Sequence, residues 1–219
     1  MSQPKPSDVL ESIPKSVVGR LSLYLRELQH LVAHGQKTIS SNKLGRRLGL
    51  TDAQVRKDLA YFGQFGYPGI GYRCDQLVGE IRKILGTDQT WSVALVGCGN
   101  LGQALLGYNG FQKQGFSIEL AFDSNPQTIG REFRSIKVAP MDRFEEVVRR
   151  KRILLAILAV PSDAAQLVAD QMVQAGICGI LNFAPITLTL PNGIGVVSVD
   201  LANRLEQLAF TVVNELRKE

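Results

Sequence analysis

The sequence predicts an α/β protein of two domains, a small helical N-terminal domain and a larger C-terminal domain built on a parallel sheet. An apolar run with strand character enters the glycine-rich stretch 97–102, and apolar runs alternate with helical patterns after it. The first 85 residues are instead helical and basic. We expect an N-terminal domain over 1–85, a linker over 86–91, the sheet domain over 92–200 and a terminal helix over 201–219.

The glycine-rich stretch has the pattern G-x-G-x-x-G between a strand and a helix, which suits the pyrophosphate of a dinucleotide. A second predicted strand, Phe116 to Phe122, ends at Asp123, 21 residues after Gly102, where an acid accepts hydrogen bonds from the adenosine ribose. The order predicts a Rossmann domain; alternatively, Asp123 only caps a turn with Asn125 and Pro126. The cofactor-binding candidates are Gly97, Cys98, Gly99, Asn100, Leu101, Gly102 and Asp123.

Charge is unevenly distributed along the chain. Residues 1–85 hold 13 Lys or Arg against 7 Asp or Glu, net +6, and the rest is net −1. This excess suggests that the first domain binds nucleic acid, although it also fits a solvated face. With neither a membrane-length apolar run nor an apolar signal core, we expect a cytoplasmic protein.

The cysteines, Cys74, Cys98 and Cys178, are scattered and odd in number, so we expect neither a disulfide framework nor a metal site. Cys98 lies at a predicted helix N-terminus. There a thiol could act as a redox sensor through a lowered pKa, or serve only as a small side chain.

In the first domain, an amphipathic helix is predicted from Ser16 to Ala33, followed by the capping cluster 38–41 and a short helix from Asn42 to Leu48. After a turn at Gly49, residues 51–54 have the capping-box pattern: the Thr51 hydroxyl serves the N3 amide and Gln54 reaches back. Along this second helix the predicted inward face is Val55, Leu59 and Phe62, and the predicted surface is Gln54, Arg56, Lys57, Asp58 and Tyr61.

Two short helices joined by a tight turn predict a helix-turn-helix, with a plain helical hairpin as the alternative. In the segment Gly63 to Arg73, glycines and a proline interrupt aromatic and β-branched residues, which fits a β-wing or a turn that only returns the chain to the domain. A helix is predicted to follow from Cys74 to Leu85. Gln suits adenine, Arg and Lys suit guanine, and the other cations and hydroxyls suit phosphates. The candidates for DNA binding are Ser40, Ser41, Gln54, Arg56, Lys57, Tyr61 and Arg73.

Beyond Asp123 the α/β pattern continues. We expect a helix over 143–151, strands over 153–160, 177–183 and 196–199, and a helix to Ala175 capped by Ser162. Two loops at strand carboxyl ends are expected to wall a nicotinamide pocket, or to be plain turns: Val160, Pro161, Asn182, Phe183, Ala184 and Pro185. The terminal helix has an apolar stripe that needs either its own sheet or another subunit: Leu201, Leu205, Leu208, Val212 and Leu216.

Taken together, the chain resembles the Rex family of redox-sensing transcriptional repressors over nearly its whole length. The segments that carry the resemblance are RLSLYLREL (20–28), QVRKDLAYFGQFG (54–66), LVGCGNLGQAL (95–105), GYNGF (107–111) and GICGILNFAP (176–185). It implies a winged-helix domain, a Rossmann domain that binds NADH and NAD+, and a homodimer that exchanges its C-terminal helices. It also implies that NADH favours a closed dimer that releases double-stranded operator DNA of two-fold symmetry. Tyr108 is implied in the cofactor pocket, and Arg26, Tyr108 and Asp200 in a switch network.

Two other functions compete with this interpretation. An NAD-dependent oxidoreductase with a DNA-binding module is disfavoured, because both histidines, His30 and His34, lie at the end of the first helix and no separate substrate domain fits after the linker. We therefore expect no catalytic residues. The other is a repressor that senses a different nucleotide-like ligand, such as a coenzyme A derivative.

Overall fold

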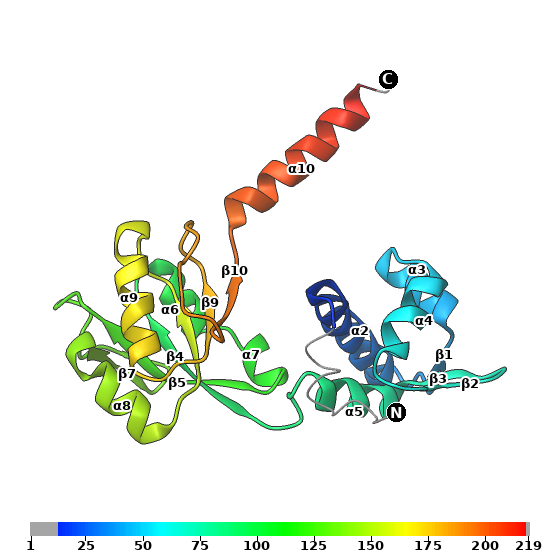
Figure 1. Ribbon diagram of the computed structural model, residues 1–219, viewed down its shortest axis with the longest axis horizontal. Coiled ribbons are helices and arrows are strands. Elements are labelled where there is room, and N and C mark those ends of the chain that lie inside the picture. Colours follow the sequence, from blue (N-terminus) through cyan, green and yellow to red (C-terminus); the bar gives the residue numbers. More distant parts are fainter. Residues whose placement is uncertain (1–12, 218–219) are drawn as a thin grey trace. The chain divides into compact units, whose positions relative to one another are not determined.

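The computed structural model describes residues 13–217, which form two compact units, one ending at Gln89 and the other beginning at Thr90 (Figure 1). Residues 1–12 and 218–219, to which the predicted N-terminal domain and terminal helix extend, lie outside the described part. No helix in that part is both long and apolar enough to span a membrane.

The first unit contains four helices and a small antiparallel sheet of order β1-β3-β2 within the described residues. Its elements are α2 (Lys15–Ala33), β1 (Thr38–Ile39), α3 (Ser41–Leu48), α4 (Asp52–Ala60), β2 (Gly66–Tyr67), β3 (Gly71–Arg73) and α5 (Cys74–Ile84). The apolar stripe of α2 is buried in the core of this unit, with Leu21, Tyr24 and Leu28 fully inaccessible. The predicted wing is the β2–β3 hairpin.

Glycine lets α3 and α4 meet at a tight turn. Gly49 ends α3 with a φ of 67°, in the left-handed region that favours glycine. At Gly45 a Cβ would lie 2.6 Å from the carbonyl oxygen of Leu50, so a larger residue there would push the helices apart. The Thr51 hydroxyl accepts from the Gln54 backbone N–H at 3.1 Å, as predicted. The reciprocal half of the capping box was wrong, because the Gln54 side chain bonds to Asp58 instead.

The second unit is a seven-stranded sheet flanked by helices, followed by a long terminal helix. Its strands are β4 (Trp91–Val96), β5 (Phe116–Asp123), β6 (Glu132–Phe133), β7 (Ile136–Pro140), β8 (Leu155–Leu158), β9 (Gly179–Asn182) and β10 (Gly195–Ser198). Its helices are α6 (Asn100–Leu106), α7 (Gly110–Lys113), the 3-10 turn η1 (Met141–Arg143), α8 (Phe144–Lys151), α9 (Ser162–Gln174) and α10 (Leu201–Leu216).

The strand order is β10-β9-β8-β4-β5-β7-β6, and every pair except β6–β7 is parallel. From β4 the chain builds the sheet outward through β5 and β7, and then returns to β8 on the other side of β4. The strand order therefore reverses between β4 and β8, and in such sheets ligands bind beyond the carboxyl ends of the strands at this point. One core cluster packs α8 and α9 on one face, and a second packs α6 on the other. The predicted α/β fold class is confirmed.

Two local features differ from the sequence predictions, and one that the sequence left open is decided. The hairpin of β6 and β7 was not predicted, because its turn residues Arg134 and Ser135 adopt positive φ angles of 47° and 67° without the usual Asn or Gly. Ser162 does not cap α9, which begins after Pro161 without a side-chain cap. The sequence left open whether the apolar stripe of α10 (Figure 1) packs on its own sheet or on another subunit. It does not pack on its own sheet, since Leu201, Leu205, Leu208, Val212 and Leu216 are all exposed.

Candidate functional site

The glycine loop follows β4 at the point where the strand order reverses, and its three glycines have different surroundings. Gly97 has a φ of 93°, and a Cβ on it would overlap the backbone carbonyl group of Ala159. A Cβ on Gly102 would overlap the carbonyl oxygen of Gly97, which sets the close packing of α6 on the loop. At Gly99 a Cβ would meet nothing within 4 Å. Gly97 and Gly102 therefore allow close packing. Gly99, the residue before α6, has open space where a side chain would be.

The backbone amides that begin α6 are suited to an anion. Gly99 is the N-cap residue, so no side chain occupies the cap, and Asn100 and Leu101 beside it are exposed. Uncapped amides and the positive end of the helix dipole favour negative charge. This arrangement can hold a pyrophosphate against the backbone.

Asp123 ends β5 next to this loop and is partly buried. Its Oδ2 accepts from the Cys98 backbone N–H at 2.7 Å, and its Oδ1 accepts from the Asn125 N–H at 2.8 Å. The carboxylate therefore stabilises both the glycine loop and the turn that follows β5. An ionised carboxylate has about four lone-pair sites, so two remain for ribose hydroxyls.

Cys98 is fully buried, with its thiol directed at the Phe122 carbonyl oxygen. Burial, together with the nearby charge of Asp123, raises the pKa of the Cys98 thiol to about 12. The lowering of the thiol pKa that a helix N-terminus can cause is therefore outweighed, and the thiol stays protonated at neutral pH. Cys98 serves as a small packing residue.

The two predicted walls lie side by side, because β8 and β9 are paired with Leu158 opposite Asn182. Asn182 is fully buried, and its amide folds the turn by donating to the Ile186 carbonyl at 3.0 Å and accepting from the Ala184 N–H at 2.9 Å. It is thus a turn former rather than a pocket surface. Phe183 and Val160 are partly buried, whereas Pro161 and Pro185 are exposed.

Tyr108 lies elsewhere on this unit. It follows α6, is 58% exposed and makes an edge-to-face contact with Phe111. With Phe116 from the start of β5 and with Arg134 it lines a depression of about 300 Å³. The structure therefore groups Tyr108 with the amino end of β5, and the glycine loop and Asp123 with the carboxyl ends. Of the other predicted switch residues, Asp200 caps α10 by accepting from the Asn203 N–H at 3.1 Å, and Arg26 is exposed on α2.

The predicted DNA-binding residues lie on α3, α4 and the wing. Ser40 caps α3 by accepting from the Lys43 N–H. Arg56 donates to Ser41 Oγ at 3.1 Å and to Asp52 Oδ2 at 2.7 Å, so it is held across the two helices while more than half exposed.

The remaining candidates, Lys57, Tyr61 and Arg73, are exposed, and the Arg73 guanidinium lies 5.3 Å from the Tyr67 ring centroid on the wing. A helix-turn-helix, a wing and exposed cations are therefore present in one unit.

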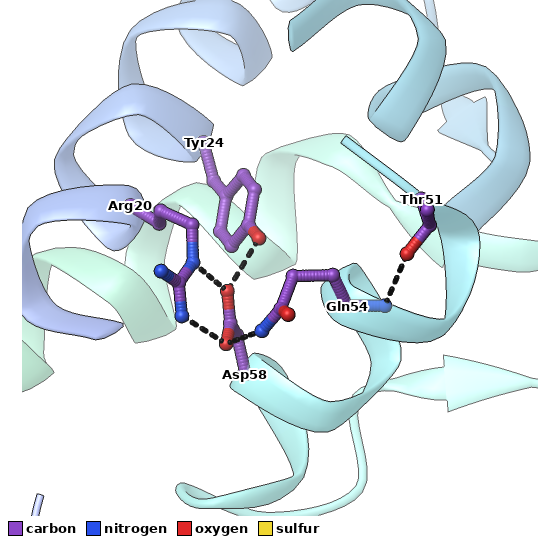
Figure 2. Close-up of polar contacts among 5 residues, drawn as sticks. All are labelled: Arg20, Tyr24, Thr51, Gln54 and Asp58. Atoms are coloured by element: carbon purple, nitrogen blue, oxygen red, sulfur yellow. Dashed lines mark hydrogen bonds and ion pairs between the residues drawn. The ribbon is translucent and has the colours of Figure 1, made fainter. Parts of the chain in front are cut away.

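A buried ionic network that the sequence analysis missed connects α4 to α2 (Figure 2). Asp58, predicted on the surface, is fully buried. Its carboxylate accepts from Arg20 Nε at 2.6 Å and Nη2 at 2.8 Å, from the Tyr24 hydroxyl at 2.7 Å, and from Gln54 Nε2 at 2.6 Å. Helical spacing gave a usable signal: Asp58 is three residues from Val55 and four from Phe62, both on the predicted inward face.

This network fixes the charge states of its members. Burial raises the pKa of Asp58, but the hydrogen bonds from Arg20, Tyr24 and Gln54 outweigh it, and the pKa lies below its ordinary value. Burial and the hydrogen bond to Asp58 raise the pKa of Tyr24. The hydrogen bond to Asp58 raises that of Arg20. Asp58 is therefore an ionised carboxylate that only accepts.

No group of three or more His, Cys, Asp or Glu side chains that could hold a metal ion occurs in residues 13–217. Comparison with protein families matches residues 88–186 to a model described as "CoA binding domain". Residues 12–60 match a model described as "Putative DNA-binding protein N-terminus".

Full-length relatives and solved structures are also similar. The chain is 46% identical over 200 residues to the redox-sensing transcriptional repressor Rex of Carboxydothermus hydrogenoformans, covering 91% of this chain and 96% of that protein. It is 48% identical to that of Desulfitobacterium hafniense, covering 91% and 95%.

A crystal structure described as RSP in complex with beta-NAD+ and operator DNA superposes with a TM-score of 0.88 at 38% identity, covering 94% of this chain and 95% of that chain. One described as RSP in complex with beta-NADH has a TM-score of 0.86 at 36% identity, covering 94% and 98%.

Proposed function

This chain belongs to the Rex family of redox-sensing transcriptional repressors, and from that premise we propose how its two units carry out DNA binding and NADH sensing. It is a DNA-binding repressor that responds to the balance of NADH and NAD+, and not an enzyme. The observation that carries the sensing role is the glycine loop at the sheet's switch point, where Gly99 is the N-cap of α6 and a Cβ on it would meet no atom within 4 Å.

The second unit binds the dinucleotide by its carboxyl edge. The loop amides from Gly97 to Gly102 hold the pyrophosphate, and the unused lone pairs of Asp123 accept from the adenosine ribose. A carboxylate at this position favours a free 2′-hydroxyl over a 2′-phosphate, hence NADH over NADPH. Phe183 and Val160 form the wall of the nicotinamide pocket. This apolar wall prefers the neutral ring of NADH to the cationic ring of NAD+.

The first unit binds an operator of two-fold symmetry through α4 in the major groove, with the wing against the backbone or minor groove. Arg56 and Lys57 contact bases or phosphates, and Arg73 contacts the backbone. Because such a repressor must reach DNA, we place it in the cytoplasm.

A second copy of the chain covers α10. Large apolar side chains are 43–70% exposed along this helix, among them Leu205, Phe210 and Leu216, and such a surface marks a protein interface. The homodimer presents two α4 helices to the two operator half-sites, and the exchanged helix links the units of different protomers. Arg26, Tyr108 and Asp200 are assigned to the network that switches between the open and closed dimer.

Coupling between the sites follows from differential affinity. A ligand shifts a conformational equilibrium only by as much as it prefers one state, so NADH binds the closed dimer more tightly than the DNA-bound form. By linkage, bound DNA lowers the affinity for NADH by the same factor. The test is a DNA-binding titration at fixed, stated salt, with NADH or NAD+ at equal occupancy. Release by NADH far more than by NAD+ is expected; equal effects of the two refute the mechanism.

A coenzyme A derivative is the second candidate ligand, because residues 88–186 match a family model described as CoA binding. Structures similar over nearly the whole chain hold NAD+ or NADH, which favours the nicotinamide cofactor. Parallel titrations with NADH, NADPH and an acyl-CoA distinguish them. Tight binding of NADH alone supports the main proposal, and tighter binding of acyl-CoA overturns it.

A further inference from the structure

The Gln54 side chain is held on one side by the buried carboxylate of Asp58 (Figure 2). Both oxygens of Asp58 are saturated: Oδ2 accepts from Arg20 and Tyr24, and Oδ1 accepts from Arg20 and Gln54. Because an ionised carboxylate offers no donor, it can face only the NH2 end of the Gln54 amide. The orientation of this amide is thereby chosen by its neighbour.

Gln54 occupies the first turn of α4, where the N-terminal residues of a recognition helix contact base edges. Its side chain is partly buried, and one amide hydrogen is engaged with Asp58. The amide therefore retains one N–H and the carbonyl oxygen in a fixed order. Adenine presents an acceptor at N7 and a donor at N6 in the major groove, whereas guanine presents two acceptors there.

We propose that Asp58 is a positioning residue for base recognition, which holds the Gln54 amide with one donor and one acceptor outward so that it reads adenine. The proposal rests on the proposed function, in that α4 is the recognition helix. The proposal predicts that each operator half-site has an A·T pair at the base pair that Gln54 contacts, called the Gln54 position below. Arg20 acts through Asp58, because it bonds both carboxylate oxygens from α2, whereas the Tyr24 hydroxyl bonds only Oδ2, the oxygen that Gln54 does not use.

Stability alone gives little reason for this arrangement. A buried ion pair is often replaced by apolar residues of similar volume without loss of stability, since desolvation offsets the attraction between the charges. An apolar pair at positions 20 and 58 would equally join α2 to α4. It would not orient the amide of Gln54, and this difference makes the two roles separable by experiment.

The experiment measures base discrimination with the full-length chain. An operator is selected from a random duplex pool by the wild-type protein, and each base pair is then replaced in turn. Wild type should lose about 10-fold to 100-fold in affinity when the A·T pair at the Gln54 position becomes G·C. Gln54→Ala should lose discrimination there and keep it elsewhere.

The decisive variant is the double substitution Arg20→Met with Asp58→Leu, which removes both charges together. It should reduce discrimination at the Gln54 position to about threefold or less, and adding Gln54→Ala should reduce it no further. Tyr24→Phe is the matched control: it removes one hydrogen bond to Asp58 but leaves the Gln54 contact, so discrimination should persist. Full discrimination in the double variant overturns the proposal, as does a Gln54→Ala protein that still prefers adenine.

If the double variant fails to fold, the wild-type protein provides the test by NMR. One of the two Gln54 side-chain amide hydrogens should be shifted downfield and protected from exchange with water, with the signal assigned by its loss in Gln54→Ala. Exchange of both hydrogens at the rate of a free glutamine overturns the proposal. Failure of the proposed function would appear differently, as a wild-type chain that binds no operator or ignores NADH.

Discussion

Substitution by alanine should have different effects at two glycines of the binding loop: it should lower thermal stability at Gly102 and lower cofactor affinity at Gly99. At Gly102 an added methyl group meets the carbonyl oxygen of Gly97, so α6 must move away from the loop. Such overpacking costs about 1–3 kcal/mol of folding free energy. For a unit of this size, Gly102→Ala should lower Tm by roughly 3–12 °C.

At Gly99 the same methyl group enters open space, and the backbone is in the extended region that alanine adopts freely (φ −67°, ψ −166°). Alanine is a poorer N-cap residue than glycine, which lowers stability. It also lowers the conformational entropy of the unfolded chain, which stabilises the fold by about 0.4–1 kcal/mol, so the two effects largely cancel. The free energy of unfolding should therefore change by less than about 1 kcal/mol. Because we propose that the pyrophosphate lies close to the backbone at this N-cap, the added methyl group should lower the affinity for NADH and NAD+ about 10-fold or more.

The assays are thermal unfolding of the ligand-free protein and fluorescence titration with NADH. A Gly99→Ala protein that binds NADH as tightly as wild type would falsify the placement of the pyrophosphate. A Gly102→Ala protein with unchanged Tm would contradict the packing account. Both substitutions add the same methyl group to the same loop, so each serves as the control for the other.

Three further predictions concern the rest of the chain. Leu205→Glu with Leu208→Glu should convert the proposed dimer to a monomer in sedimentation equilibrium, because both exposed side chains lie on the helix that the second copy is proposed to cover, where burying a charge is unfavourable; a variant that stays dimeric opposes the assignment. At pH 8 a thiol reagent should modify exposed Cys178 and leave buried Cys98, whose thiol is protonated, unmodified in peptide mapping; equal modification contradicts this. The stability that Asp58 contributes should be present above its unfolded pKa of about 3.9 and be lost as pH falls through its lowered folded pKa. Urea unfolding of wild type and Asp58→Asn between pH 2 and 7 checks it, and parallel curves for the two proteins would contradict it.

Local sequence signals predicted the elements whose physical cause is local. The strand, glycine loop and acid occur in the expected order, and two of the three glycines meet local requirements that no other residue meets: Gly97 has a positive φ, and Gly102 packs against the Gly97 carbonyl oxygen. The helix-turn-helix was predictable from the cap at Thr51 and the left-handed Gly49. These features are encoded within a few residues.

What the sequence did not predict depends on partners distant along the chain. The hairpin at Arg134 and Ser135 lacks turn-specific residues, so tertiary contacts determine it. The position of α10 could not follow from periodicity, since an apolar stripe does not indicate which surface covers it. The place of Tyr108 in the cofactor pocket stays a prediction, because Tyr108 follows α6 and lines the depression beside Phe116.

Asp58 shows how a residue can be misplaced when only the apolar positions of a helix are taken as its inward face. It was assigned to the surface because Val55, Leu59 and Phe62 were taken as that face, yet a carboxylate can be buried when its charge is paired and hydrogen-bonded. Arg20 and Tyr24 lie four residues apart on α2, so one helix face supplies three of the four donors, and Gln54, four residues before Asp58 on α4, supplies the last. A polar residue at an inward helical position should therefore be considered together with donors at i, i+4 spacing on neighbouring helices. In this chain that pattern connects the fold of the first unit to the amide that we expect to read the operator.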